Sequence, residues 1–126
     1  MIAATSIRLF INLAQYNYGN QYYDLHNDYS CEKVSFEDGV LLVIFKSFIN
    51  DKCLLLKFTD VKITNLSLFS VKGVESLTLD NLYRGRFEIN GELIEVADDG
   101  KGYFYLEFYE GQKLGFWAKG MDIEQM

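Results

Sequence analysis

The sequence predicts an all-β fold, mainly antiparallel, from its aromatic content, its lack of proline and its regular division by turn-forming residues. Aromatic side chains make up 16% of the 126 residues, and such side chains favour strands. Because the chain has no proline, its turns must be formed by glycine, asparagine, aspartate and serine. Short apolar runs separated by these residues are typical of an antiparallel meander, which packs as a sandwich or a partly open barrel.

The N-terminal part, residues 6–18, fits two different elements. Apolar residues alternate from Ile7 to Leu13 as they do in a strand. Ile7, Phe10 and Ala14 are also spaced as on one face of a helix, which Gly19 would end. The sequence therefore leaves an N-terminal helix and a strand as open alternatives.

From Ser30 onward the apolar runs predict a series of strands. Residues 40–48 are apolar on both faces and predict a central strand. Residues 52–58 alternate, as expected of a strand with one buried face. Further strands are expected around 61–68, 77–79, 87–89, 93–97, 103–109 and 113–119, with the last 40 residues forming a meander. The predicted turns lie at residues 37–39, 50–51, 90–91, 98–102 and 110–111.

Length and composition indicate one domain, residues 1–126, large enough to bury a core. The net charge is −6, and residues 86–126 hold four bases against nine acids. Such a surface repels phosphate groups, so nucleic-acid binding is disfavoured and a basic protein partner is favoured. No segment approaches the roughly 18 apolar residues of a membrane span.

The two cysteines predict free thiols and a reducing, cytoplasmic setting. Cys31 and Cys53 lack the C-x-x-C spacing of a zinc or redox site. On the first and third strands of a meander they would lie about 9–10 Å apart, beyond disulfide reach. The N-terminal segment lacks the basic start of a signal peptide, and Arg8 interrupts its apolar run.

The strand at 103–109 predicts a candidate binding surface. Its two-residue period places Phe and Leu on one face and polar aromatic residues on the other. On the next strand the same rule adds a tryptophan and lysines to the polar face. If this face is the outer one, it forms an interface patch of the kind that Tyr and Trp often anchor; the alternative is that it packs against a second sheet or the N-terminal segment. The candidate binding residues are Tyr103, Tyr105, Glu107, Tyr109 and Trp117.

A second, weaker candidate site surrounds the only histidine. An extended backbone would place Asp24, His26 and Asp28 on one side, where they could hold a divalent metal. Turn formation is the competing explanation for these residues. No cofactor is expected, since the chain contains neither a G-x-S-x-G nucleophile motif nor a phosphate-binding loop. Arg84 and Arg86 would share one strand face, where they could grip a carboxylate or, as the more common case, form part of a solvent-exposed edge.

Residues 24–69 resemble the opening of small acidic immunity-type proteins of bacterial polymorphic toxin systems. The resemblance rests on the run Asp24-Leu25-His26-Asn27-Asp28, a following hairpin, and the pattern Leu54-x-Leu56-x-Phe58-x-x-Val61. It departs from the family's His-Asp pattern because Asn27 stands between His26 and Asp28. The resemblance implies a protein that binds and blocks a cognate toxin.

Three function classes follow from these observations. The first is a non-enzymatic protein-binding module, immunity-like and acting through the Tyr and Trp face on a basic partner. The second is a small-ligand or metal-dependent enzyme centred on Asp24, His26 and Asp28. The third is a structural component of a larger assembly. The sequence leaves the identity of the partner and the oligomeric state open.

Overall fold

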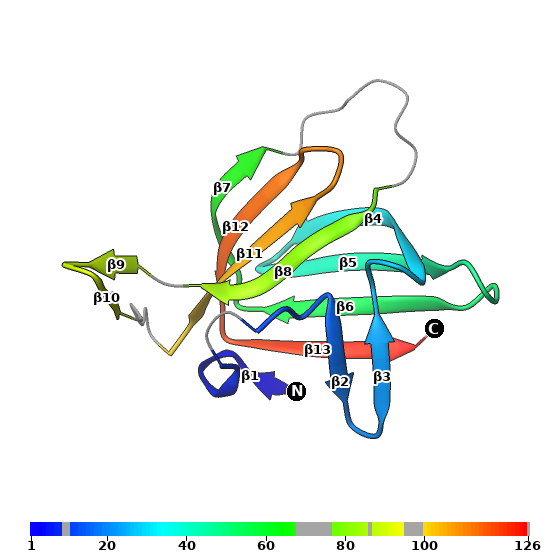
Figure 1. The fold of residues 1–126 in the computed structure, drawn as a ribbon, viewed down its shortest axis with the longest axis horizontal. Helices are drawn as coiled ribbons and strands as arrows, with labels where there is room; N and C mark the ends of the chain where they lie inside the picture. Colours follow the sequence, from blue (N-terminus) through cyan, green and yellow to red (C-terminus); the bar gives the residue numbers. More distant parts are fainter. Residues whose placement is uncertain (9–10, 68–76, 86, 95–99, 126) are drawn as a thin grey trace.

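The computed structural model confirms the all-β fold (Figure 1). It describes the chain except for residues 9–10, 68–76, 86, 95–99 and 126. Within the described part, the helical content is a single 3-10 turn, η1 (Ala4–Ser6). The strands are β1 (Ile2–Ala3), β2 (Gln15–Tyr18), β3 (Gln21–Asp24), β4 (Tyr29–Glu37), β5 (Val40–Ser47), β6 (Cys53–Thr59), β7 (Lys62–Ser67), β8 (Leu79–Gly85), β9 (Phe87–Ile89), β10 (Glu92–Ile94), β11 (Gly102–Phe108), β12 (Lys113–Ala118) and β13 (Gly120–Gln125).

Most strands belong to two antiparallel sheets. The five-stranded sheet has the order β1-β13-β6-β5-β4, and the four-stranded sheet has the order β7-β12-β11-β8. The pairs β2-β3 and β9-β10 form separate hairpins. In Figure 1 the β2-β3 hairpin runs vertically across the level of β6 and β13, with its turn below them, and the β9-β10 hairpin projects at the left of the view.

Two paired strands bend together and join the sheets along one side. β6 continues into β7, and β12 continues into β13, with pairing on both sides of the bend: Trp117 faces Lys62, and Gly120 faces Thr59. At the bend the Lys119 amide donates a hydrogen bond of 2.9 Å to the Thr59 carbonyl, and Asp60 has a φ of 51°. Corners of this kind are typical of sheets that pack nearly at right angles.

On the opposite side, a β-bridge joins the two sheets. The amide of Cys31 donates to the carbonyl of Leu77 at 2.7 Å, and the amide of Leu77 donates back at 2.9 Å. Cys31 belongs to β4, and Leu77 precedes β8, so the two end strands of the sheets touch at this point. Of the two arrangements left open by the sequence, the partly open barrel describes this fold better.

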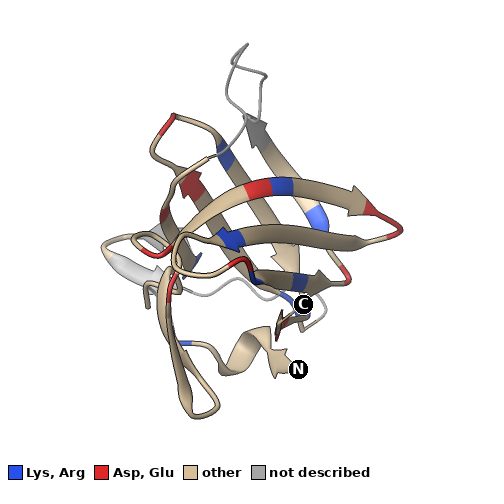
Figure 2. Cartoon of the chain, turned by 90° about the vertical axis from the view of Figure 1, so that its right-hand side faces the viewer, with Lys and Arg blue, Asp and Glu red and all other residues tan. Residues whose placement is uncertain are grey.

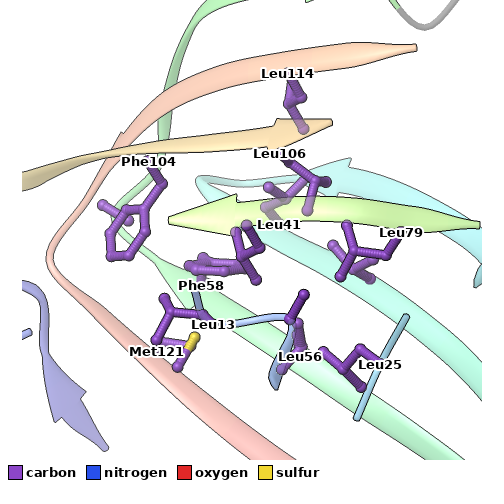
Figure 3. Close-up of a cluster of buried hydrophobic side chains, with 14 of the residues drawn as sticks. Leu13, Leu25, Leu41, Leu56, Phe58, Leu79, Phe104, Leu106, Leu114 and Met121 are labelled. Carbon is purple, nitrogen blue, oxygen red and sulfur yellow. The ribbon is translucent and has the colours of Figure 1, made fainter. Parts of the chain in front are cut away.

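The core lies between the two sheets and follows the alternation of their strands (Figure 3). Phe58 occupies its centre, with its ring centroid 5.2 Å from that of Phe104 and 4.8 Å from that of Phe116. Leu13 and Leu25, from the N-terminal segment, point into the same cluster as Leu56 and Met121. The other buried members from the sheets are Cys31, Leu41, Val43, Phe45, Leu54, Leu79, Leu82, Leu106, Phe108, Leu114 and Ala118.

The described part of residues 6–18 contains β2 and no α-helix, so the helical alternative is not observed. Asn12 forms a bridge with Tyr83, and the Leu13 amide donates to the Leu82 carbonyl at 2.6 Å. These contacts bury Leu13 and Ala14 and give the backbone a partner on β8. The strand alternative holds for residues 15–18 alone, because the described residues between η1 and β2 form neither a helix nor a strand.

Tight turns fall where the sequence predicts them. Asp38 and Gly39 have φ values of 52° and 75°, and Asn90 and Gly91 have values of 52° and 77°. Two consecutive positive values define the type I′ turn, whose twist matches that of a hairpin and which favours Asp-Gly and Asn-Gly. These turns fix the registers of β4 with β5 and of β9 with β10.

The expected meander of the last 40 residues is wrong in its order. β8 pairs with β11, so the β9-β10 hairpin lies outside both main sheets. The sheet does not finish at Lys119, because β13 follows it and crosses to the other sheet. β10 ends at Ile94, and the predicted strand residues 95–97 lie outside the described part of the chain, as do residues 98–99 of the following turn.

No helix among the described residues has the length and apolar character needed to cross a membrane.

Candidate functional site

The strand β11 has the two faces that its sequence predicts. Phe104, Leu106 and Phe108 are buried on the inner face. Tyr103, Tyr105 and Glu107 lie on the outer face and are half-buried. Tyr109, just beyond the strand, is 77% exposed. The outer face of the four-stranded sheet is therefore the candidate site.

Three cross-strand rows make up this outer face. Residues directly opposite each other in an antiparallel pair lie on the same side of the sheet. The first row holds Gly85, Tyr103, Trp117 and Lys62; the second holds Tyr83, Tyr105, Gly115 and Asn65; the third holds Asn81, Glu107 and Lys113. We call the four aromatic side chains, Tyr83, Tyr105, Tyr103 and Trp117, the tyrosine face.

The rings of the tyrosine face contact one another in sequence across the sheet. The ring centroids lie 5.5 Å apart for Tyr83 and Tyr105, 4.9 Å for Tyr105 and Tyr103, and 5.0 Å for Tyr103 and Trp117. The last two pairs are edge-to-face, an arrangement that aromatic quadrupoles favour. Each ring thus restricts its neighbour, and the strip is ordered before any partner binds.

Two glycines on the neighbouring strands leave space for tyrosine rings that lie across them: the Tyr105 ring lies over Gly85, and the Tyr103 hydroxyl lies over Gly115. A Cβ on Gly85 would lie 2.6 Å from a ring carbon of Tyr105, and a Cβ on Gly115 would overlap the Tyr103 hydroxyl. Any larger residue at either position would push the ring out of the strip. Glycines in a strand often mark this kind of close approach.

The hydroxyl groups of the face are also ordered. The Tyr103 oxygen lies 2.7 Å from the Thr64 hydroxyl, at hydrogen-bonding distance. Burial raises the pKa of Tyr105, and the charges of Tyr103, Tyr83 and Glu107 raise it further. Burial, followed by the charge of Glu107, also raises the pKa of Tyr83. These hydroxyls therefore stay protonated near neutral pH and can donate hydrogen bonds.

Carboxylates border one end of the tyrosine face. Glu107 stands in the third row, and the neighbouring strand β8 carries the exposed Asp80. Just beyond β11, Glu110 accepts a hydrogen bond of 2.7 Å from the Thr78 amide, and the Tyr109 amide donates to the Thr78 carbonyl at 2.8 Å. The most exposed aromatic side chain of the site, Tyr109, is thus held among acidic residues.

Trp117 belongs to the tyrosine face but is not an exposed anchor. Its side chain is only 9% exposed, so the expectation that it joins an open aromatic and charged patch is wrong in that respect. Tyr103 packs edge-to-face against it. Trp117 therefore supports the tyrosine strip from one end, and its removal would affect stability before it affected recognition.

Tyr83 is a member of the site that the sequence pattern misses. Leu77 and Leu79 suggest an alternation that would place Tyr83 inside. A bulge shifts the register between β8 and β11 at Glu107/Phe108, and the inner positions then continue at Leu82 and Arg84. One extra residue in a strand reverses the face of every later side chain.

The same register shift buries Arg84, so the prediction of an exposed pair of guanidinium groups is wrong for this residue; Arg86 lies outside the described residues. Arg84 Nη1 donates hydrogen bonds to the carbonyls of Thr5, at 3.2 Å, and Ile7. Burial lowers the pKa of the guanidinium below its usual range. Arg84 thus fastens the N-terminal segment to the four-stranded sheet.

The group Asp24, His26 and Asp28 forms a turn. The Asp24 carboxylate accepts hydrogen bonds from the amides of His26 and Asn27 and from the Asn27 side chain, at 2.8–3.2 Å. His26 Nδ1 lies 2.7 Å from the Leu79 carbonyl and donates to it, and the Asp28 amide donates to the Asp24 carbonyl. No three metal-binding side chains converge anywhere in the described part of the chain.

These bonds make the loop sensitive to acid. Burial raises the pKa of Asp24, but hydrogen bonds from Asn27, Gln15 and His26 outweigh it and lower the pKa below 3.8. A carboxyl whose pKa is lowered by folding contributes stability above its unfolded pKa and loses it as the pH falls through its folded pKa. The Asp24 contribution is therefore fully present at neutral pH and declines progressively as the pH falls below about 4.

We expect the Asp24→Asn variant to lose about 1 kcal/mol of unfolding free energy at pH 7. The measurement is urea unfolding of wild type and variant at pH 7 and near pH 3, where the difference should shrink. Asp51→Asn, in an exposed turn, is the matched control and should change little. An equal loss at both pH values would contradict this role for the charged carboxylate.

Both cysteines are free thiols, as the sequence predicts. Cys31 is buried in the core, and burial raises its pKa to about 12. Cys53 is half-buried and faces Lys46, on the outer side of β6. Neither lies within the tyrosine face.

Comparisons of the chain with family models, curated proteins and solved structures found no match. The features of the molecule that bear on function are its antiparallel, partly open barrel and the ordered aromatic strip on one outer face.

Proposed function

We propose that this protein is a non-enzymatic protein-binding module that engages a basic partner through the tyrosine face and Tyr109. The observation that carries the proposal is the contact chain from Tyr83 to Trp117, which orders four large rings on an outer sheet surface. Ordered aromatic residues bind at low entropic cost, and Tyr is enriched among the residues that dominate binding energy.

The charge distribution supports a basic partner. The chain has a net charge of −6, and Glu107, Asp80 and Glu110 belong to the end of the face that also exposes Tyr109, where Lys113 stands opposite Glu107. Complementary charge increases the association rate and disfavours acidic competitors. In this proposal the tyrosine rings supply contact area, while the carboxylates orient the partner.

The proposal includes an immunity-like role, in which the bound partner is a toxin whose activity is blocked. Its support is the resemblance of residues 24–69 together with the acidic, aromatic surface that neutralisation of a basic protein needs. We also place the protein in the reducing environment of the cytoplasm. The support for this location is that Cys31 and Cys53 are both free thiols.

The test is affinity capture from a lysate of the native host with three versions of the immobilised protein. Wild type and Tyr22→Ala should capture the same basic protein, because Tyr22 is 56% exposed but lies on β3, away from the face. Tyr105→Ala should lose it, with a fall in affinity of about 30-fold or more once the captured protein is titrated.

Circular dichroism of the Tyr105→Ala protein should first confirm that it is folded. Glu107→Lys should weaken capture, and the loss should be larger at low salt than at high salt, because salt screens the electrostatic interaction with the basic partner. Equal capture by wild type and Tyr105→Ala would exclude the tyrosine face as the binding surface.

A further inference from the structure

The outer face of the five-stranded sheet carries an apolar stripe that the core does not use. On β5 the residues Leu41, Val43 and Phe45 point inward and are fully buried. The residues between them point outward, are half-buried and are absent from the core cluster and from the residues packed against it. The stripe consists of Val40, Leu42 and Ile44 on β5 and Cys53 and Leu55 on β6.

Charged residues flank this stripe in a regular order. One cross-strand row runs Glu124, Leu55, Ile44, Lys33 from β13 to β4. The next row runs Asp122, Lys57, Leu42, Ser35. In Figure 2 most of β5 is uncharged, and charged residues lie on its neighbours. Acidic residues thus border the stripe on the β13 side, Glu32 and Lys33 border it on the β4 side, and Lys57 stands beside Leu42 at one end of the β6 part.

We propose that this stripe is the interface of a symmetric homodimer. A two-fold axis parallel to the strands, between β5 and β6, would stack two copies face to face. It would place Leu55 of one copy against Ile44 of the other and Glu124 against Lys33. In the next row it would place the Lys57 stem of one copy over Leu42 of the other. In such an isologous interface each residue pair occurs twice. Two-fold symmetric dimers are the commonest soluble oligomers.

The charge balance of the face favours a second copy over a partner of strong charge. The outward charged residues of this sheet face are Glu37, Asp122, Glu124 and Glu32, which accepts a hydrogen bond from the Ser30 hydroxyl, against Lys33, Lys46 and Lys57. The face therefore carries a net charge of about −1 on a chain whose net charge is −6. Two acidic copies repel each other through most of their surface, but much less here. The Asp122 carboxylate is already paired with the N-terminal amine at 3.0 Å, which leaves Glu124 and Lys33 as the pair that can act between copies.

The test is sedimentation velocity and light scattering of the purified full chain at roughly 1–200 μM protein. Wild type should pass from monomer to dimer over this range. Ile44→Glu, which places a charge at the centre of the interface, should remain monomeric. Glu124→Lys should raise the dimer dissociation constant at least about tenfold, because each lysine would then face Lys33 of the other copy.

A charge exchange separates this pairing from a general charge effect. The double variant Lys33→Glu with Glu124→Lys should recover most of the wild-type dimer, since opposite charges face each other again. Asp80→Lys, an exposed residue of the other sheet with the same charge change, is the control and should dimerise like wild type. Thermal unfolding should show that all variants are folded. A wild type that stays monomeric throughout, or a double variant no better than Glu124→Lys, would overturn the proposal; the stripe would then belong to a different partner or the pairing would be wrong.

Discussion

Replacement of Phe58 by alanine is expected to lower the free energy of unfolding by about 3–5 kcal/mol. Phe58 is fully buried and contacts Phe104 and Phe116 from the facing sheet. Its loss would remove the ring that fills the space between the sheets and leave a cavity that backbone hydrogen bonding prevents from collapsing. Both the lost burial and the empty space destabilise the native state.

Phe48→Ala is the matched control for this prediction, because Phe48 is 69% exposed in the turn after β5. Its effect should stay within about 0.5 kcal/mol. Chemical unfolding followed by tryptophan fluorescence suits both variants, since Trp117 is buried in the folded chain. If the two alanine variants unfolded at the same denaturant concentration, Phe58 would not be at the centre of the core.

The second large effect is expected for Arg84→Met, at about 2–3 kcal/mol. Methionine can fill much of the space, but it cannot donate to the Thr5 and Ile7 carbonyls as the guanidinium does. Most of the lost unfolding free energy comes from these carbonyls, which remain shielded from water but no longer have a charged hydrogen-bond donor. Since these carbonyls belong to the N-terminal segment, that segment should loosen before the sheets unfold.

Hydrogen exchange distinguishes this local effect from a general loss of stability. The Leu13 amide, which donates to the Leu82 carbonyl, should exchange faster in Arg84→Met, whereas the Leu56 amide in the centre of β6 should be affected only through global unfolding. Lys119→Met, at an exposed position, is the control. Unchanged exchange at Leu13 would show that Arg84 does not hold the segment in place.

The strand faces that depend only on alternation could be predicted from sequence. The segment 103–109 alternates Tyr or Glu with Phe or Leu, so its two faces follow from the period of a strand. The Asp-Gly and Asn-Gly turns at 38–39 and 90–91 were equally predictable, because few residue pairs accept two positive φ values. These signals are local, and each can be recognised within ten residues.

The features that the sequence does not predict depend on contacts between distant segments. The bulge opposite Glu107 and Phe108 places Tyr83 and Arg84 on the faces opposite to those expected from the alternation of Leu77 and Leu79. No residue type on β8 predicts this bulge. Likewise, Trp117 is an outer residue by alternation, yet it is buried. The order β8-β11, which omits the β9-β10 hairpin, arises from long-range pairing that local patterns do not encode.

The shared bend at Asp60 and Lys119 has a consequence for how the molecule comes apart. The same two segments, β6-β7 and β12-β13, are paired on both sides of this bend. Neither sheet can therefore unfold independently, because separating the two segments in one sheet also weakens their pairing in the other. The layers should therefore denature in one concerted transition, and the angle between their two solvent-facing surfaces should hold until that transition.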